Sequence, residues 1–290
     1  MTAIALNTLA VIGVGLIGGS FAAALKSAGL VQRVVGVGRS RANLERALAL
    51  GVIDEIVGEA SAAAAQADVV FVAVPVRQTE SVLQQIAPHL QPDALVTDGG
   101  STKQDVAAAA ARALGPLAAQ FVPAHPIAGA ERSGVEAASA TLYRDRLVVL
   151  TPTSATRADA VERVHGLWSA CGARVVRMDA ARHDAVFAAV SHLPHVLAFA
   201  LVHELASRPD ADDLFSFAGA GFRDFTRIAG SSAEMWRDIA LANRDALLAE
   251  IDAYRAQLDR FADCIASGDG ERLADMFERA RGARSKWLGK

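Results

Sequence analysis

Short apolar runs alternate with longer stretches of mixed apolar and polar residues through the first part of the chain. The runs are rich in valine, isoleucine and leucine, and they occupy residues 9–12, 34–37, 69–74, 95–97, 121–123, 147–150 and 174–178. Runs of this length predict buried strands, and the stretches between them carry charged residues at helical intervals. Alternation of strand and helix is typical of a doubly wound, mostly parallel sheet. We therefore expect an α/β domain in this part of the chain.

The pattern changes near residue 180, beyond which no run predicts a further strand. Long helical stretches follow at residues 182–206, 235–262 and 270–281. We therefore expect an α/β domain over residues 1–178 and an all-helical domain over residues 179–290. Within the first helical stretch, the missing N–H of Pro194 predicts a kink, which would turn the side chains on either side of it in different directions.

A glycine-rich motif with the sequence GVGLIG follows the first predicted strand and opens a helix. Gly13, Gly15 and Gly18 suit a tight turn, a close backbone approach to a pyrophosphate, and a helix N-terminus that faces the phosphates. This context favours a cofactor site over an incidental glycine turn. The motif predicts that the α/β domain is a Rossmann-type domain that binds a dinucleotide.

The residues after the second predicted strand bear on the choice of cofactor. A carboxylate there would bind the ribose 2′-hydroxyl of NAD, but the sequence offers Arg39, Ser40 and Arg41. An arginine can hold a 2′-phosphate by two parallel hydrogen bonds, so NADP is favoured over NAD. The alternative is that Arg39 only faces solvent near the adenine. The candidate cofactor-binding residues are Gly13, Gly15, Leu16, Ile17, Gly18, Arg39, Ser40 and Arg41, with Val74 and Pro75, which line the cofactor cleft or belong to the ordinary core.

The composition excludes several classes of partner. The chain has 290 residues, 52% of them apolar, which is enough to bury a core in each of two domains. A formal net charge of −3 with scattered basic residues gives no field that attracts nucleic acid or an anionic membrane. The apolar run at residues 195–206 is too short to span a bilayer, and the N-terminus does not resemble a signal peptide. We expect a cytoplasmic protein without a membrane segment, in which Cys171 and Cys264 are buried free thiols.

Three further motifs accompany the glycine loop. They are HPIAGAE at residues 125–131, SHLPH at 191–195, and DFTRIA at 224–229, which MWRD follows at 235–238. Together the four motifs resemble the prephenate/arogenate (cyclohexadienyl) dehydrogenases of tyrosine biosynthesis, over essentially the whole chain. The resemblance implies an oxidoreductase that moves a hydride from the C4 carbinol of a cyclohexadiene to NAD(P) and releases the C1 carboxylate as CO2. The product would be 4-hydroxyphenylpyruvate from prephenate, or tyrosine from arogenate.

The resemblance also implies a role for particular residues. His125, directly after a predicted strand, would be the base toward the C4 hydroxyl, and Ser101 would orient this histidine and the substrate. Arg227 would be the main clamp for a substrate carboxylate. The other implied positions are Ser191 against the cofactor amide, His195 against the substrate side chain, and Glu131, Asp224, Ser231 and Trp236 as gate or support residues.

Ordinary structural explanations exist for the same residues. A lone histidine such as His125 is usually structural, Ser101 could cap a helix, and Arg227 could form an ion pair with Asp224. The two histidines of the SHLPH motif could share a metal ion. No nearby cysteine or carboxylate pair completes a ligand set, so we expect no zinc site.

Assembly, regulation and substrate preference follow from the resemblance only in outline. It implies a homodimer through the helical domain and a monofunctional enzyme, with any inhibition by tyrosine acting at the active site itself. Prephenate and arogenate differ only in a keto or an ammonium group, so the preference between them is open. Glu131 could pair with the ammonium group of arogenate.

Two other classes of protein stay as alternatives. A β-hydroxyacid dehydrogenase or imine reductase has a similar plan, but its catalytic lysine motif is not evident between residues 182 and 206. A non-catalytic NADP-sensing regulator would keep the glycines without needing His125, Ser191 and Arg227 together. A short-chain dehydrogenase is excluded, because neither tyrosine in the chain is followed by a lysine four residues later.

Overall fold

A computed structural model describes residues 5–129 and 134–289 of the chain. By their internal contacts the residues divide into two compact units, Met1–Arg244 and Asp245–Lys290. The first unit holds every described strand and the helices up to α11, and the second holds a pair of long helices. The expected domain boundary between residues 178 and 179 stays a prediction.

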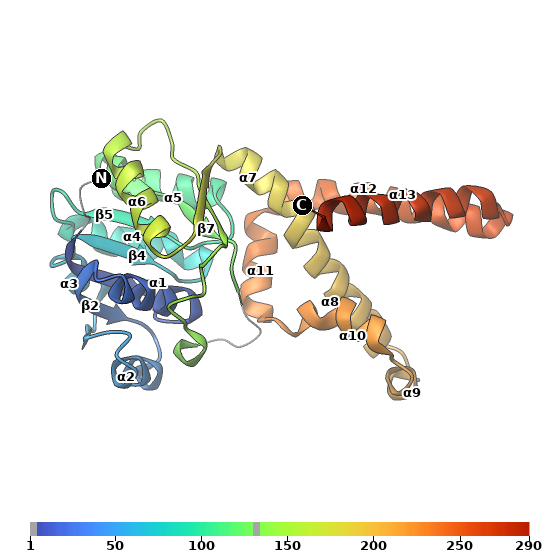
Figure 1. Ribbon diagram of the computed structural model, residues 1–290, viewed down its shortest axis with the longest axis horizontal. Coiled ribbons are helices and arrows are strands. Elements are labelled where there is room, and N and C mark those ends of the chain that lie inside the picture. The colour runs from blue at the N-terminus through green and yellow to red at the C-terminus, as the bar shows by residue number, and fades with distance from the viewer. Residues whose placement is uncertain (1–4, 130–133, 290) are drawn as a thin grey trace. The chain divides into compact units, whose positions relative to one another are not determined.

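The described part of the first unit contains a six-stranded parallel sheet, which confirms the α/β class (Figure 1). Alternate residues of one central strand enter different cores, Leu9 and Val11 on one face and Ala10 and Ile12 on the other. This period of two is the reason that a doubly covered strand is apolar throughout. In spatial order the strands are β3 (Glu55–Ile56), β2 (Val31–Val37), β1 (Leu6–Ile12), β4 (Val69–Val72), β5 (Leu95–Asp98) and β6 (Phe121–Val122).

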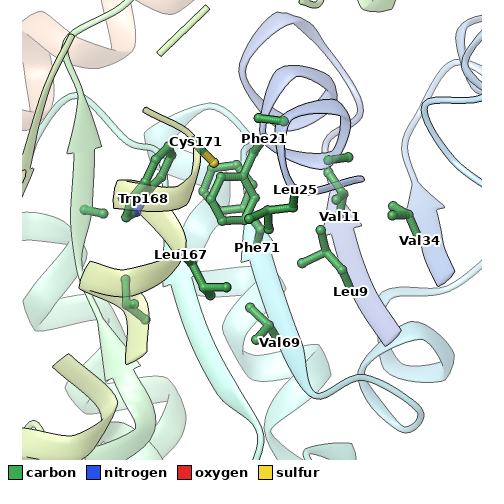
Figure 2. Close-up of a cluster of buried hydrophobic side chains, with 14 of the residues drawn as sticks. Leu9, Val11, Phe21, Leu25, Val34, Val69, Phe71, Leu167, Trp168 and Cys171 are labelled. Carbon is green, nitrogen blue, oxygen red and sulfur yellow. The ribbon is translucent and has the colours of Figure 1, made fainter. Parts of the chain in front are cut away.

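Helices cover both faces of this sheet. On one face, Phe21 from α1, Phe71 from β4 and Trp168 from α6 form an aromatic cluster with ring centroids 4.4–5.6 Å apart (Figure 2). On the other face the core draws on α3, α4 and α5. The helices of this part are α1 (Leu16–Ser27), α2 (Arg41–Ala49), α3 (Ala60–Ala64), α4 (Thr79–Ile86), α5 (Gln104–Leu114) and α6 (Ala158–Ala170).

A second, three-stranded sheet departs from the prediction of one continuous sheet. Its strands are β7 (Ala124–Pro126), β8 (Leu147–Leu150) and β9 (Arg174–Arg177), with β7 antiparallel to β8 and β8 parallel to β9. Pro123 separates β6 from β7, and because it has no N–H it cannot continue the parallel ladder. The predicted strands at residues 147–150 and 174–178 are therefore real but belong to this second sheet. The short strands β3 and β7 were not predicted, because neither forms an apolar run in the sequence.

The predicted kinked helix at residues 182–206 is a helical run with a change of hydrogen-bond register. It consists of α7 (Ala180–Phe187), a π-helical turn (Ala188–His192) and α8 (Leu193–Ala206), which has Pro194 in its first turn. Proline lacks the N–H that an α-helix needs, and the wider π turn ahead of it absorbs the irregularity.

The same 27-residue run has a mean hydropathy of 1.9 over its most apolar window, so it is long and apolar enough to cross a membrane by length and composition alone. The apolar run predicted from the sequence, residues 195–206, is shorter than this helical run. His183 and Asp184 within it are buried and hydrogen-bonded to other parts of the first unit. These polar contacts anchor the start of the run in the first unit, whereas only 28% of its most apolar window is buried.

The remaining helices of the first unit are α9 (Ala211–Ser216), α10 (Ala220–Thr226) and α11 (Ala233–Ala242). The predicted helix at residues 235–262 is interrupted at Asn243, after which α12 (Arg244–Ser267) begins. Among the described residues no strand follows β9, as the sequence predicted.

The second unit is a helical hairpin of α12 and α13 (Gly270–Leu288). Gly268 has a φ of +68°, which allows the reversal, and the Asp269 side chain caps α13 by accepting a hydrogen bond from the N–H of Arg272 at 3.0 Å. Phe261 and Phe277 pack with ring centroids 5.5 Å apart. Several large apolar side chains of this unit are exposed, namely Leu248, Leu258, Ile265, Phe277, Trp287 and Leu288.

Candidate active site

The structural reason for glycine differs among the three glycines of the motif between β1 and α1. Gly13 has a φ of +100°, and a Cβ there would lie 2.3 Å from the carbonyl oxygen of Ala73. A Cβ on Gly18 would lie 2.1 Å from the carbonyl oxygen of Gly13. The fold itself therefore requires glycine at both positions, because no side chain fits such contacts.

Gly15 is different, because a Cβ there would meet no atom of the described residues within 4 Å, and its φ of −108° is open to any residue. The packing of the described residues gives no reason for glycine at this position. Gly15 is the N-cap of α1 and supplies no side-chain hydrogen bond, so the first N–H groups of the helix are left for another acceptor. A pyrophosphate that approaches the backbone closely fits both observations.

The residues after β2 make different contacts. The Ser40 hydroxyl caps α2 by accepting from the N–H of Asn43 at 3.2 Å, and Arg41 pairs with Glu45 at 2.8 Å. The exposed Arg39 guanidinium makes no ion pair or hydrogen bond with another residue in the described ranges. Arg39 is therefore the candidate among the three that is available to a ligand.

Val74 and Pro75 follow β4 at the edge that carries the glycine loop. The backbone N of Val74 would lie 3.2 Å from a Cβ on Gly13, which places the two segments side by side. Val74 also packs against the hydrophobic core, so its ordinary structural role is present as well.

His125 lies inside β7, not directly after a strand as expected. Its side chain is buried, its Nδ1 atom lies 2.8 Å from Nε2 of His183, and its ring packs against Phe187 with centroids 4.8 Å apart. Burial, followed by the neighbouring His183, Lys103 and His192, holds the pKa of His125 well below its usual range. The imidazole is therefore neutral at physiological pH.

Asp184 connects this histidine pair to the start of α5. Its carboxylate accepts hydrogen bonds from Nδ1 of His183 at 2.8 Å and from the N–H groups of Lys103 and Gln104 at 2.8 and 2.9 Å. Burial acts to raise the pKa of Asp184, but these hydrogen bonds outweigh it and the pKa is lowered. Ser101, which could have been the cap, is not the N-cap residue, because α5 begins one residue after Lys103 and its cap comes from Asp184.

Lys103 and Asp98 form a buried ion pair next to the start of α5. Nζ of Lys103 is 2.5 Å from the Asp98 carboxylate and 2.8 Å from the carbonyl oxygen of Ala124. The other Asp98 oxygen accepts from the N–H of Ala124 at 2.9 Å. Both charged side chains are almost completely inaccessible, so each depends on the other for compensation. The pair joins the end of β5 to β7 and thereby positions His125.

A second group of side chains surrounds Trp236 on α11. The His195 ring stacks on it with centroids 3.6 Å apart, and Nδ1 of His195 lies 2.9 Å from the carbonyl oxygen of Ser191. Burial, and to a smaller degree the charge of Arg227, lower the pKa of His195. Arg227 begins a short 3₁₀ turn (Arg227–Gly230) that follows α10.

His192 and Asn243 connect the two groups. The amide Nδ2 of Asn243 donates to the backbone oxygen of Asp184 at 2.8 Å and lies 3.0 Å from Nδ1 of His192. Burial lowers the pKa of His192 to about 4. The Nε2 atom of His192 and the Nε1 atom of Trp236 are buried without a hydrogen-bond partner among the described residues. Both nitrogens are suited to a ligand with acceptor oxygens.

The structure thus brings together some of the candidate residues and not others. Ser191, His195, Trp236 and Arg227 form one group, and His125 is joined to it through His183, Asp184, Asn243 and His192. Asp224 is exposed on α10, Ser231 is half-buried after the 3₁₀ turn, and Ser101 is half-buried after β5. Glu131 lies outside the described residues. The roles given to these residues stay predictions.

Four residues of this arrangement were not predicted from the sequence, namely His183, Asp184, Lys103 and Asn243. The one available signal was the pair of adjacent polar residues His183 and Asp184 ahead of an apolar helix. Cys171 and Cys264 are buried free thiols, as predicted. In the described residues no group of three or more histidine, cysteine or acidic side chains could hold a metal ion.

Both halves of the chain resemble known proteins. The family described as "Prephenate dehydrogenase, nucleotide-binding domain" matches residues 21–177, and the one described as "Prephenate dehydrogenase, dimerization domain" matches residues 179–279. The prephenate dehydrogenase of Bacillus subtilis is 38% identical over 96% of this chain and 75% of its own length. The cyclohexadienyl dehydrogenase of Zymomonas mobilis is 36% identical over 95% of this chain and 94% of its own.

Two solved structures have the same fold over nearly the whole chain. Prephenate dehydrogenase from Aquifex aeolicus, in complex with hydroxyphenyl propionate and NAD+, has a TM-score of 0.92 at 35% identity and covers 98% of this chain and 99% of its own. Synechocystis arogenate dehydrogenase has a TM-score of 0.80 at 30% identity, covering 97% of this chain and 99% of its own. Since both halves match the family and relatives above 30% identity span almost the full length, the chain belongs to the prephenate dehydrogenase family.

Proposed function

We propose that this chain catalyses the oxidative decarboxylation of prephenate, arogenate or both, with hydride transfer to a nicotinamide cofactor. Relatives named prephenate, cyclohexadienyl and arogenate dehydrogenases support the reaction class. The observation that carries the proposal is the buried, neutral His125, because the reaction needs a group that accepts a proton from the ring hydroxyl as the hydride leaves.

The bound cofactor supplies the acceptor for the hydride. The residues of this chain can accommodate the cofactor, because Gly15 leaves open the space that a side chain would fill beside the N-terminus of α1. The Aquifex relative was solved with NAD+. Here we infer a preference for NADP, because Arg39 stands at the end of β2 where a ribose-binding carboxylate would be, and its guanidinium is available for a 2′-phosphate.

The substrate's carboxylates need cationic partners. The charge of Arg227 acts on His195, whose ring stacks on Trp236, and a planar guanidinium could hold a carboxylate by two hydrogen bonds. The unpartnered Nε2–H of His192 and Nε1–H of Trp236 supply two further donors in the same group. We assign Ser191 to the cofactor amide because of the resemblance of the SHLPH motif to the family's motif. If tyrosine inhibits, it would compete for this same group, because it shares the carboxylate and the ring with the substrate.

We further propose that the protein is a homodimer. The match to a dimerization domain over residues 179–279 supports it, and so do the exposed large apolar side chains of the second unit, which are unusual on a surface that meets only water.

An assay with four combinations tests the function: prephenate or arogenate, each with NAD or NADP, followed by the absorbance of the reduced nicotinamide. Oxidation of at least one substrate with release of CO2 is expected. The His125→Asn variant should lose about 10²- to 10⁴-fold in turnover with little change in the Michaelis constant, because asparagine cannot act as the base. No oxidation in any combination, or near-normal turnover of the variant, would overturn the proposal.

A further inference from the structure

Three side chains form a line that ends at His125. The Asp184 carboxylate contacts Nδ1 of His183, and Nε2 of His183 contacts Nδ1 of His125, each at 2.8 Å. All three side chains are buried. We propose that His183 and Asp184 are positioning residues that fix the tautomer of His125, so that its Nδ1 carries the proton and its Nε2 is the bare nitrogen that acts as base. This inference rests on the proposed function of His125.

The assignment of protons follows from the chemistry of each group. An ionised carboxylate can only accept, so the Nδ1 atom of His183 must carry the proton of that contact. A neutral His183 then has a lone pair at Nε2, which can only accept. The Nδ1 atom of His125, at the other end of the second contact, must therefore donate. In a neutral imidazole this leaves Nε2 of His125 without a proton.

The hydrogen bonds around Asp184 keep its carboxylate ionised. Its two oxygens also accept from the N–H groups of Lys103 and Gln104, which are among the orphan donors at the start of α5. The N-terminus of a helix favours a negative charge, and a protonated Asp184 would lose part of this bonding. One carboxylate therefore both caps α5 and sets the direction of the hydrogen bonds that reach His125.

The charged and titratable groups around His125 are consistent with this arrangement. Lys103, whose Nζ is paired with Asp98, and His192, which is neutral, both lower the pKa of His125. Burial lowers the pKa of His183, although the hydrogen bond to Asp184 acts to raise it. Both imidazoles of the line are thus neutral before the reaction. When the substrate O–H bond breaks and an N–H bond forms at Nε2 of His125, the new positive charge lies one imidazole away from the Asp184 carboxylate, which stabilises it.

Two substitutions of His183 separate positioning from packing. Phenylalanine keeps a ring against Phe187 and His125 but offers no acceptor to Nδ1 of His125. Glutamine loses the ring but can present its amide oxygen near the place of Nε2. We expect His183→Phe to lower turnover about 10²-fold, the lower end of a general base's contribution, with little change in the Michaelis constant. We expect His183→Gln to recover most of this loss. The exposed His89, replaced in His89→Phe, is the matched control and should behave as wild type.

Nitrogen NMR of the imidazoles in the ligand-free protein gives a second readout that needs neither substrate nor cofactor. The signals of His125 are assigned by their loss in His125→Asn. In the wild type they should show protonation at Nδ1, and in His183→Phe and Asp184→Asn this preference should be lost. Protonation of wild-type His125 at Nε2 would overturn the inference, and so would a His183→Phe variant that is more active than His183→Gln.

The two proposals fail in distinguishable ways. A protein that oxidises neither prephenate nor arogenate but shows the Nδ1–H form of His125 would overturn the proposed function and support the tautomer assignment. An active enzyme whose wild-type His125 carries its proton at Nε2 would do the reverse. If His183→Phe does not fold, the wild-type spectrum alone still decides between the two tautomers.

Discussion

Substituting alanine for each glycine of the nucleotide loop should separate a requirement of folding from a requirement of binding. At Gly15 the backbone conformation is open to alanine, and the new Cβ meets nothing within 4 Å in the part of the chain that the structure describes. Alanine has less backbone freedom than glycine in the unfolded chain, which stabilises the folded state by about 0.4–1 kcal/mol. Alanine at the N-cap of α1 destabilises it by a similar amount, on the order of 0.5–1 kcal/mol. The free energy of unfolding of Gly15→Ala should therefore stay within about 1 kcal/mol of wild type.

The other two positions should behave in the opposite way. Gly13→Ala combines a φ of +100° with a Cβ only 2.3 Å from a backbone oxygen. Strain and overpacking of this kind each cost about 1–3 kcal/mol, so a loss of roughly 2–6 kcal/mol is expected. Gly18→Ala places its Cβ 2.1 Å from the Gly13 oxygen and 2.8 Å from the Val11 side chain, and it should lose about 1–3 kcal/mol or more. Losses of this size are a large share of a typical domain's stability.

The assay is urea unfolding followed by tryptophan fluorescence, for which Trp168 is a buried reporter, together with calorimetric titration of NADP and NAD. Gly15→Ala should unfold near the wild-type midpoint yet bind the cofactor at least tenfold more weakly, or about 1.4 kcal/mol. Gly282→Ala, at a helical glycine in α13 with no neighbour within 4 Å, is the control and should leave cofactor affinity unchanged. Wild-type affinity in Gly15→Ala, or unfolding as early as in Gly13→Ala, would refute the reasoning.

Three further outcomes are expected. Arg39→Ala should weaken the binding of NADP by about 1.5–3 kcal/mol and the binding of NAD much less. Equal losses of affinity for the two cofactors in a binding titration would contradict the NADP preference. Arg227→Ala should raise the Michaelis constant by an amount corresponding to about 2–5 kcal/mol, and Arg227→Lys should recover little of it, since lysine lacks the planar fork; steady-state kinetics of both variants check this. The pKa of His192 falls from 6.5 to about 4 on folding, so the folded state is fully favoured above 6.5 and loses up to about 3 kcal/mol as pH drops from 6.5 through 4. Urea unfolding near pH 7 and near pH 5 should show this loss in wild type and a smaller one in His192→Leu.

Features with local signals could be predicted from the sequence. The glycine loop and most strands of the parallel sheet were predicted because a turn residue or an apolar run is visible within a few neighbouring positions. An irregularity of the helix near the π turn could be predicted from Pro194, because the missing N–H is a property of the residue itself. β3, Glu55–Ile56, holds a single apolar residue, so it forms no apolar run that could be recognised.

Features that depend on distant partners could not be predicted. The separation of β7 from the main sheet depends on pairing with β8, and nothing in the residues 124–126 reveals that partner. The contact between His125 and His183 joins residues 58 positions apart. The cap of α5 comes from Asp184, which is 80 positions from Gln104, so the nearby Ser101 was the natural but incorrect candidate. Side chains that meet only after folding leave no mark on the local sequence.

The π turn between α7 and α8 has a consequence for how this chain tolerates insertions and deletions. A π turn contains one residue more than the α-helical turn it replaces, and each residue of an α-helix advances the direction of the side chains by about 100°. Removing a single residue there, such as the exposed Val190, would let an α-helical turn replace the π turn. Because either turn completes about one rotation, the later side chains of α8 would keep nearly the same direction relative to α7, and His195 would still stack on Trp236. A one-residue insertion, by contrast, would turn His195 by about 100° away from Trp236 unless a second wide turn formed. This run should therefore tolerate a one-residue deletion better than a one-residue insertion.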